Sequence, residues 1–166
     1  MATTSLLQSL ATAVGIGRLL PMYAAFGALR YVVPLPTLAR WAWQAPSAPR
    51  DLAREQRMVA RVTWVQAHVA RLRPRGDCLH RSLLLYRELS RSGADPMLVV
   101  GFRQAGGRIV GHAWVLADGG PVAESAEAVE AFTPALAFGR DGALRASAPG
   151  YASASSGGPD DAAWFI

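Results

Sequence analysis

The 166-residue sequence contains no lysine, and all seventeen of its basic residues are arginine. It contains a single cysteine, Cys78, so no disulfide can form within the chain and nothing indicates an oxidising compartment. Only 17% of the residues are charged and 51% are hydrophobic, which excludes a wholly disordered chain and a collagen-like or disulfide-stapled scaffold. We therefore expect a globular, cytoplasmic protein.

Acidic residues are scarce in the first half of the chain. Residues 1–76 carry ten arginines against two acidic residues, a net charge of +8, whereas residues 77–166 carry seven arginines against ten acids, a net charge of −3. The basic residues follow one helix face without exposed aromatics or a recognisable reading module, which argues against a nucleic-acid partner. A solvated helix face, or a docking surface for an acidic peptide or a membrane, fits this pattern better.

The sequence lacks both a basic signal region at its start and an uninterrupted apolar run. The first basic side chain is Arg18, and the apolar stretch 6–33 is interrupted by Arg18, Pro21 and Arg30. A membrane-spanning helix needs about 20 predominantly apolar residues. We therefore expect two or three short helices within 5–46, broken at Pro21 and around Pro34–Pro36, packed on the domain or in peripheral contact with the inner membrane face.

Two longer helices follow. From Arg50 to about Arg73, apolar residues recur at helical spacing, and Pro74 and Gly76 end the pattern. Asp77 occupies the position of a helix N-cap before the apolar run 78–89, so a second helix is predicted to begin at Cys78. The buried stripe of the first helix is predicted to comprise Met58, Val62, Val65, Val69 and Leu72.

Beyond Gly93 the pattern changes to strands separated by glycine-rich turns. Helices followed by an antiparallel meander predict an α+β fold. The predicted strands are 97–102, 108–117 and 121–124, followed by a short helix and a closing segment within 125–138. The chain is thus divided into an apolar, basic helical region (1–49), a core (50–138) and a flexible Ala/Ser/Gly-rich tail (139–166).

Cys78 and His112 are the residues best suited to nucleophilic catalysis. In the first turn of a helix, unpaired backbone N–H groups and the helix dipole favour a thiolate at Cys78. His112 lies on the middle predicted strand, a rigid element that can place a general base opposite a helix N-terminus. The alternatives are that Cys78 is a small buried hydrophobic residue and that His112 is a core residue packed against Trp114.

Metal and phosphate chemistry are disfavoured, and no cofactor is predicted. Cys78, His80 and His112 are potential zinc ligands, but no CxxC or HxxxH spacing accompanies them. His80 points about 200° around the helix from Cys78. We interpret His80 and His68 as structural residues. The Gly-Gly pairs at 106–107 and 119–120 fit turns rather than phosphate-binding loops.

Three segments together resemble a known family. Asp77-Cys78-Leu79-His80-Arg81-Ser82 opens a helix, 98–102 is a strand, and Gly111-His112-Ala113-Trp114-Val115 is another strand. They resemble the transglutaminase-like cysteine peptidases of lasso-peptide biosynthesis, in particular the stand-alone leader peptidases, over residues 50–138. The resemblance implies a papain-like core in which a cysteine-bearing helix packs on a small antiparallel sheet, with Cys78 as nucleophile and His112 as base.

The same resemblance implies an activity and partners. The expected reaction is removal of the leader from a ribosomally made lasso-peptide precursor, which frees the core's N-terminus for macrolactam formation by a separate cyclase. The chain has no evident peptide-recognition domain, so a small leader-recognition protein is the expected partner. Two alternatives remain: an acyl transferase on the same fold, and a non-catalytic adaptor that binds a partner or membrane through its basic helices.

The resemblance also implies an acidic residue that orients the histidine, and Glu124 is the predicted one. Asp118 is six residues along the strand from His112, roughly 20 Å away at about 3.3 Å per residue, and is better explained as a turn residue. A three-residue loop at 118–120 would pair Glu124 with Trp114 and place it diagonal to His112. A two-residue turn at 119–120 would pair it with Val115, on the wrong face.

Overall fold

The computed structural model describes residues 17–70 and 78–145. Residues 17–29 are helical. The elements that follow are α2 (Leu35–Ala42), α3 (Leu52–Ala70), α4 (Cys78–Ser92), β1 (Met97–Ala105), β2 (Arg108–Ala117), β3 (Gly120–Pro121), α5 (Ala126–Glu130), β4 (Thr133–Phe138), a 3-10 turn (Arg140–Gly142) and β5 (Leu144–Arg145). Helices precede an antiparallel sheet, so the predicted α+β class is confirmed.

The first helices pack on α4 rather than extending away from the domain. Leu19, Tyr23 and Phe26 recur on one face of residues 17–29 and are buried in the main core cluster. The predicted break at Pro21 is wrong, because the helix continues through Pro21 while its buried face packs on the core. The break predicted around Pro34–Pro36 is confirmed, because the first helix ends before α2, whose first turn contains a proline. Among the described residues, no helix is long and apolar enough to cross a membrane.

Helix α3 confirms the predicted amphipathic pattern. Val62 and Val65 are completely buried, and Met58 and Val69 pack against the same core cluster. The helix packs along α4. The predicted end of this helix, the predicted stripe residue Leu72 and the predicted N-cap Asp77 lie outside the described residues.

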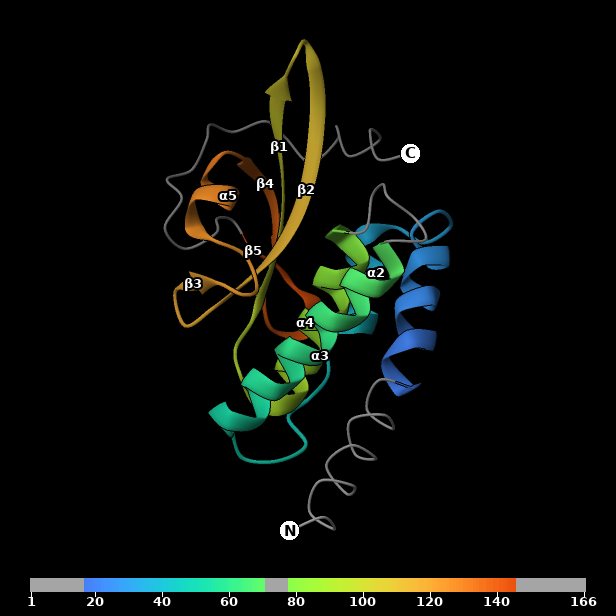
Figure 1. The fold of residues 1–166 in the computed structure, drawn as a ribbon, viewed down its shortest axis with the longest axis vertical. Helices are drawn as coiled ribbons and strands as arrows, with labels where there is room; N and C mark the ends of the chain where they lie inside the picture. The colour runs from blue at the N-terminus through green and yellow to red at the C-terminus, as the bar shows by residue number, and fades with distance from the viewer. Residues whose placement is uncertain (1–16, 71–77, 146–166) are drawn as a thin grey trace.

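The sheet has five strands in the order β3-β2-β1-β4-β5. Its two faces bury alternate residues. Leu98, Val115 and Phe138 pack against the helices, whereas Trp114 belongs to a second cluster with Val129 of α5. Figure 1 shows α3 and α4 on one side of the sheet and α5 on the other. A hairpin of β1 and β2 projects beyond the rest of the sheet in the same view.

The third predicted strand is shorter than expected and its register differs. β3 comprises only Gly120–Pro121, and Ala117 pairs with Gly120. The loop is therefore Asp118-Gly119, where both residues have positive φ, as a two-residue hairpin turn of this type requires. Both loop registers considered for Glu124 are wrong. The chain leaves the sheet after Val122, where Ala123 has φ 62°.

The segment after α5 also differs from the expectation. The predicted closing segment around Thr133 is a sheet strand, β4, which pairs with β1 on the side opposite β2. The sheet is therefore not a simple meander. Residues 139–145, which the sequence places in a flexible tail, form the 3-10 turn and β5, which pairs with β4. The rest of the predicted tail, 146–166, lies outside the described residues.

Candidate active site

Cys78 is the first residue of α4 and is half-buried. One helical turn further on, the Ser82 hydroxyl donates a hydrogen bond of 2.8 Å to the carbonyl oxygen of Ala113, the neighbour of His112 on β2. Helix α4 returns through residues 93–96 into β1, and β1 is antiparallel to β2, so α4 and β2 run in the same direction (Figure 1). Cys78 therefore lies toward the His112 side of the Ser82 contact.

His112 is held by Glu124. The distance between His112 Nε2 and Glu124 Oε2 is 2.6 Å, and the glutamate side chain is only 10% exposed. A carboxylate can only accept a hydrogen bond, so this contact places the imidazole proton on Nε2. The lone pair is then on Nδ1, the nitrogen that can accept a proton from a thiol. The structure thus brings together His112 and Glu124, as predicted, although through a different path of the chain.

Arg81 is a further charged residue at this site, one that the sequence analysis did not single out. It is 8% exposed and forms an ion pair with Glu124. It also donates a hydrogen bond of 3.3 Å to Gln66 of α3. Burial lowers the pKa of its guanidinium, and an electrostatic interaction with Cys78 opposes that effect. The available sequence signal was a basic residue at i+3 from Cys78, inside an apolar helix where a charge requires a partner.

Aromatic rings fix the plane of the His112 imidazole. It stacks on Phe132 at a centroid distance of 4.8 Å and an interplanar angle of 29°. The guanidinium of Arg103 lies 5.0 Å from the centre of the Phe132 ring. Burial lowers the pKa of His112 below its usual value of 6.5, and the positive charges of Arg81 and Arg103 lower it further. The site therefore favours a neutral imidazole, the form that acts as a base.

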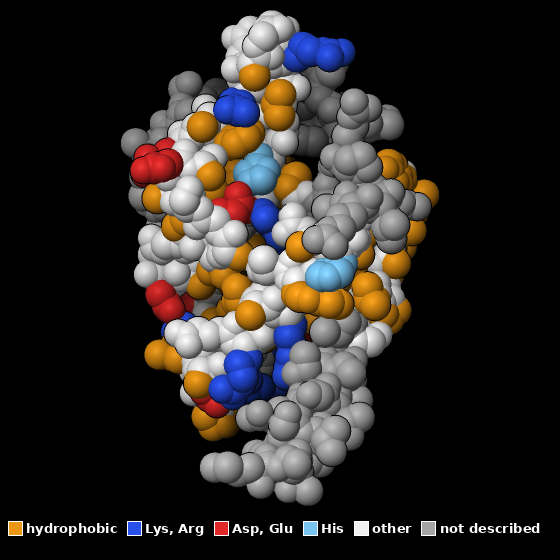
Figure 2. Space-filling model, viewed as in Figure 1, with side chains coloured by type: hydrophobic (Ala, Val, Ile, Leu, Met, Phe, Trp, Pro, Cys, Tyr) orange, Lys and Arg blue, Asp and Glu red, His pale blue; other side chains and the backbone are white. Residues whose placement is uncertain are grey.

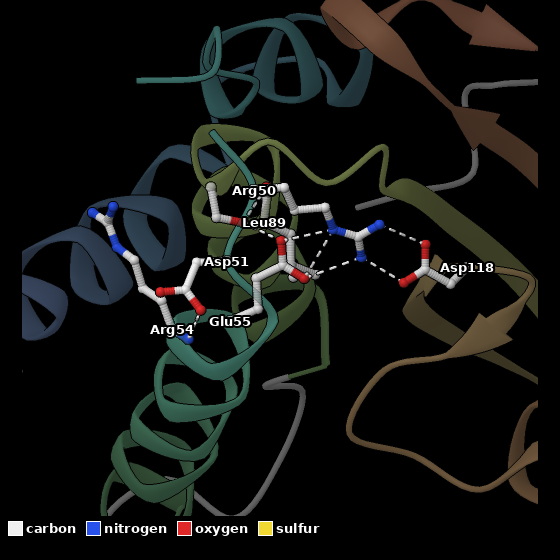
Figure 3. Close-up of polar contacts among 7 residues, drawn as sticks. Arg50, Asp51, Arg54, Glu55, Leu89 and Asp118 are labelled. Carbon is white, nitrogen blue, oxygen red and sulfur yellow. Dashed lines mark hydrogen bonds and ion pairs between the residues drawn. The ribbon is translucent and has the colours of Figure 1, made fainter. Parts of the chain in front are cut away.

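Asp118 is bound by Arg50, whereas Glu124 is bound by His112; Figure 3 shows the Arg50 contact. The Asp118 carboxylate accepts hydrogen bonds from Arg50 at 2.5 and 2.9 Å, and Arg50 also binds the buried Glu55 at 3.0 Å. The hydrogen bond with Arg50 lowers the pKa of Asp118. This cluster fastens the β2–β3 turn to the start of α3. Asp118 is thus a turn residue, as the sequence predicts.

The other two histidines lie outside this arrangement. His80 is buried, and its ring makes an edge contact with Tyr23 at 5.6 Å. His68 stacks on Trp64 at 3.7 Å, and its Nδ1 lies 2.8 Å from the Trp64 carbonyl oxygen. Within residues 17–70 and 78–145, no group of three or more His, Cys, Asp or Glu is arranged to hold a metal ion.

Comparison with known families gives a match to the transglutaminase-like superfamily over residues 18–137. The match covers most of the chain. This protein belongs to the transglutaminase-like superfamily. Searches of curated proteins and of solved structures gave no significant match.

The transglutaminase-like match includes all the site residues described above. It begins at residue 18, so it also covers residues 18–29 of the first helix and α2, which pack on α4. The superfamily includes cysteine peptidases and acyl transferases. Both reactions form an acyl-enzyme on a cysteine. A cysteine nucleophile, a histidine base and an acid that orients the histidine are suited to this step. The family match therefore gives the fold.

Proposed function

We propose that this protein is a cysteine peptidase in which Cys78 is the nucleophile, His112 the general base and Glu124 the residue that orients His112. The observation that carries the proposal is the 2.6 Å contact between His112 and the buried carboxylate of Glu124. His112 lies on β2, the strand that the Ser82 hydrogen bond joins to α4, and α4 begins at Cys78. A nucleophile, a base and a group that orients the base are the parts of a catalytic triad.

The first half of the reaction makes an acyl-enzyme. Nδ1 of His112 takes the thiol proton of Cys78 while Glu124 accepts the hydrogen bond from Nε2. The sulfur attacks the peptide carbonyl carbon, and the carbonyl oxygen becomes an oxyanion. Backbone N–H groups in the first turn of α4, including that of Cys78, are donors suited to this charge. The C–N bond then breaks, and the leaving amine takes the proton from His112.

The second half regenerates the enzyme. Water gives a proton to Nδ1 of His112 and its oxygen attacks the thioester carbon. The C–S bond breaks, the acid product leaves, and the thiol of Cys78 recovers its proton. The buried, cationic surroundings of His112 suit this step, because an imidazole with a lowered pKa is neutral near pH 7 and ready to accept a proton.

The proposed substrate is the precursor of a lasso peptide, cut between its leader and its core. This part of the proposal is supported by the resemblance of the segments around Cys78 and His112 to lasso leader peptidases. The net charge of +8 in residues 1–76 suits docking of an acidic partner or peptide. A small leader-recognition protein would deliver the precursor, and a separate cyclase would use the freed amine.

Acyl transfer is the second candidate, because the superfamily includes acyl transferases and the same three residues would serve them. The difference is the acceptor of the acyl group, water or an amine. Intact-mass analysis separates the two reactions, because hydrolysis adds water to the precursor fragments and transfer adds the amine.

The test combines the purified protein with a leader-plus-core precursor and its recognition protein, and follows the products by mass spectrometry. We expect cleavage that the recognition protein accelerates, that salt weakens, and that Cys78→Ala abolishes. Glu124→Gln should slow cleavage by about 100-fold or more, the range of general acid–base contributions. The matched control is Glu127→Gln, an exposed acid in α5. An unreactive Cys78 would instead favour the adaptor alternative.

A further inference from the structure

The outer edge of β2 is open next to the candidate active site. β2 pairs with β1 from Arg108 to Leu116, but it pairs with β3 only at Leu116 and Ala117. In the part of the chain that the structure describes, no other strand pairs with β2 on that side. Unpaired backbone groups at a sheet edge form a template on which an extended peptide can add as a further strand.

Two hydrogen bonds establish which backbone groups of β2 point toward this edge. The carbonyl oxygen of Val115 accepts from the backbone N–H of Val122, and that of Ala113 accepts from the Ser82 hydroxyl, both at 2.8 Å. Backbone groups alternate in direction along a strand. Gly111 and Ile109 therefore direct their N–H and C=O groups toward the same edge, and both residues are exposed.

Gly111 is a glycine that the packing does not require. At Gly101, its neighbour on β1, an added Cβ would lie 2.5 Å from the Thr133 carbonyl oxygen, so packing there demands glycine. At Gly111 an added Cβ would meet only the Gly101 oxygen, at 4.0 Å, and the backbone is not in the left-handed region. Glycine weakens a strand, and it often marks a place where another backbone approaches closely.

We infer that an extended segment of the peptide substrate adds to the open edge of β2 at Ile109 and Gly111, and that this strand leads the scissile bond to Cys78. The inference rests on the proposed function. Position 111 shares a sheet face with Ala113, the face that packs on α4. Because α4 and β2 run in the same direction, position 111 lies alongside the N-terminal turn of α4. A side chain there would occupy the approach to Cys78.

The side chains of the hairpin formed by β1 and β2 indicate the chemistry of the peptide segment that would bind there. Residues 97–117 include no acidic residue and two exposed arginines, Arg103 and Arg108, which share one face. The other face carries Phe102 and Ile109, which are 42% and 80% exposed. Figure 2 shows basic and hydrophobic side chains together at this projecting end of the molecule. The complementary strand alternates acidic and apolar residues.

The experiment measures binding without cleavage. The probe is a fluorescein-labelled, end-blocked octapeptide of alternating glutamate and valine, titrated by fluorescence anisotropy against the Cys78→Ala protein. We expect saturable binding that an added Gly111→Val substitution weakens about tenfold or more. Gly120→Val is the matched control, because Gly120 lies on β3 and an added Cβ there meets nothing within 4 Å. This control should bind like the parent.

Two further probes test the strand geometry and the charge. N-methylation of every second residue should abolish binding in one of the two possible phases and spare it in the other, because only alternate N–H groups face β2. Replacing glutamate by lysine should also abolish binding. Equal affinity for the Gly111→Val and Gly120→Val proteins, or equal effects of the two N-methylation phases, would overturn the inference.

Folding and catalysis are controlled separately. In the protein that retains Cys78, Gly111→Val should not lower the melting temperature, because the space at position 111 accepts a side chain and valine is favoured in strands over glycine. If the probe binds as described but the wild-type protein does not hydrolyse the precursor, the proposed peptidase function is contradicted, and the peptide-binding site at the edge of β2 stands. If the wild-type protein cleaves the precursor but Gly111→Val does not change probe binding, the peptidase function stands and the peptide site at the edge of β2 is contradicted.

Discussion

Replacement of Arg81 by methionine tests how far the candidate site depends on a buried charge. Methionine keeps the length of the side chain and removes the guanidinium. Arg81 is 8% exposed, and its ion pair with Glu124 lies between the helix of Cys78 and the strand of His112. Without it, the hydrogen bond from His112 is the contact that the buried carboxylate of Glu124 keeps among residues 17–70 and 78–145.

The expected loss of stability follows from the burial of the pair. Removing one partner of a buried ion pair costs about 3–5 kcal/mol. Each side chain here is 10% exposed, and Glu124 retains one partner, so we expect the lower end, about 3 kcal/mol. In a domain of this size 1 kcal/mol shifts the melting temperature by about 2–4 °C, so the Arg81→Met variant should melt about 6–12 °C below wild type.

The assay is a double-mutant cycle followed by thermal unfolding. Arg81→Met, Glu124→Gln and the double variant are compared with wild type, and Arg57→Met, an exposed arginine of α3, is the matched control. We expect the double variant to be more stable than the sum of the single effects predicts, by about 1 kcal/mol or more. Additive effects, or an Arg81→Met protein as stable as the Arg57→Met control, would refute the reasoning.

Three further predictions follow from the same site and its frame. The pKa of His112, measured by NMR of its ring proton, should lie below 6.5 and should rise in Arg103→Gln. Because the unfolded chain then takes up this proton more readily than the folded protein, the free energy of unfolding should fall as the pH drops below 6.5. Gly101→Ala should lower the free energy of unfolding by about 1–3 kcal/mol, because the added Cβ overlaps the β4 backbone. Asp118→Asn should leave the cleavage rate unchanged, since Asp118 binds Arg50 and not the imidazole.

The local patterns around Cys78 and His112 were sufficient to predict the elements that carry them. Pro74 and Gly76 end the helical pattern before Cys78, and the strand containing His112 has the alternation and glycine turns of a hairpin. These signals depend on neighbours in sequence, so α4 and β2 begin where the sequence predicts. The catalytic roles of the two residues stay predictions.

Long-range pairing could not be predicted in the same way. β4 is short and contains Pro134, and its pairing with β1 and β5 makes it a strand. Glu124 reaches His112 although the predicted register is wrong, because the chain leaves the sheet at Ala123 and places the carboxylate from outside it. The partner of a buried charge such as Arg81 likewise depends on segments that meet only in the folded chain.

The most direct test of the account is the rate at which iodoacetamide alkylates Cys78, measured by intact mass as a function of pH. The account predicts alkylation near neutral pH that is faster than that of free cysteine, because His112 acts as a base toward the Cys78 thiol. It also predicts slower alkylation in the His112→Ala protein, which has lost the group that takes up the thiol proton. Labelling of folded wild-type protein no faster than free cysteine, or unaffected by His112→Ala, would contradict it.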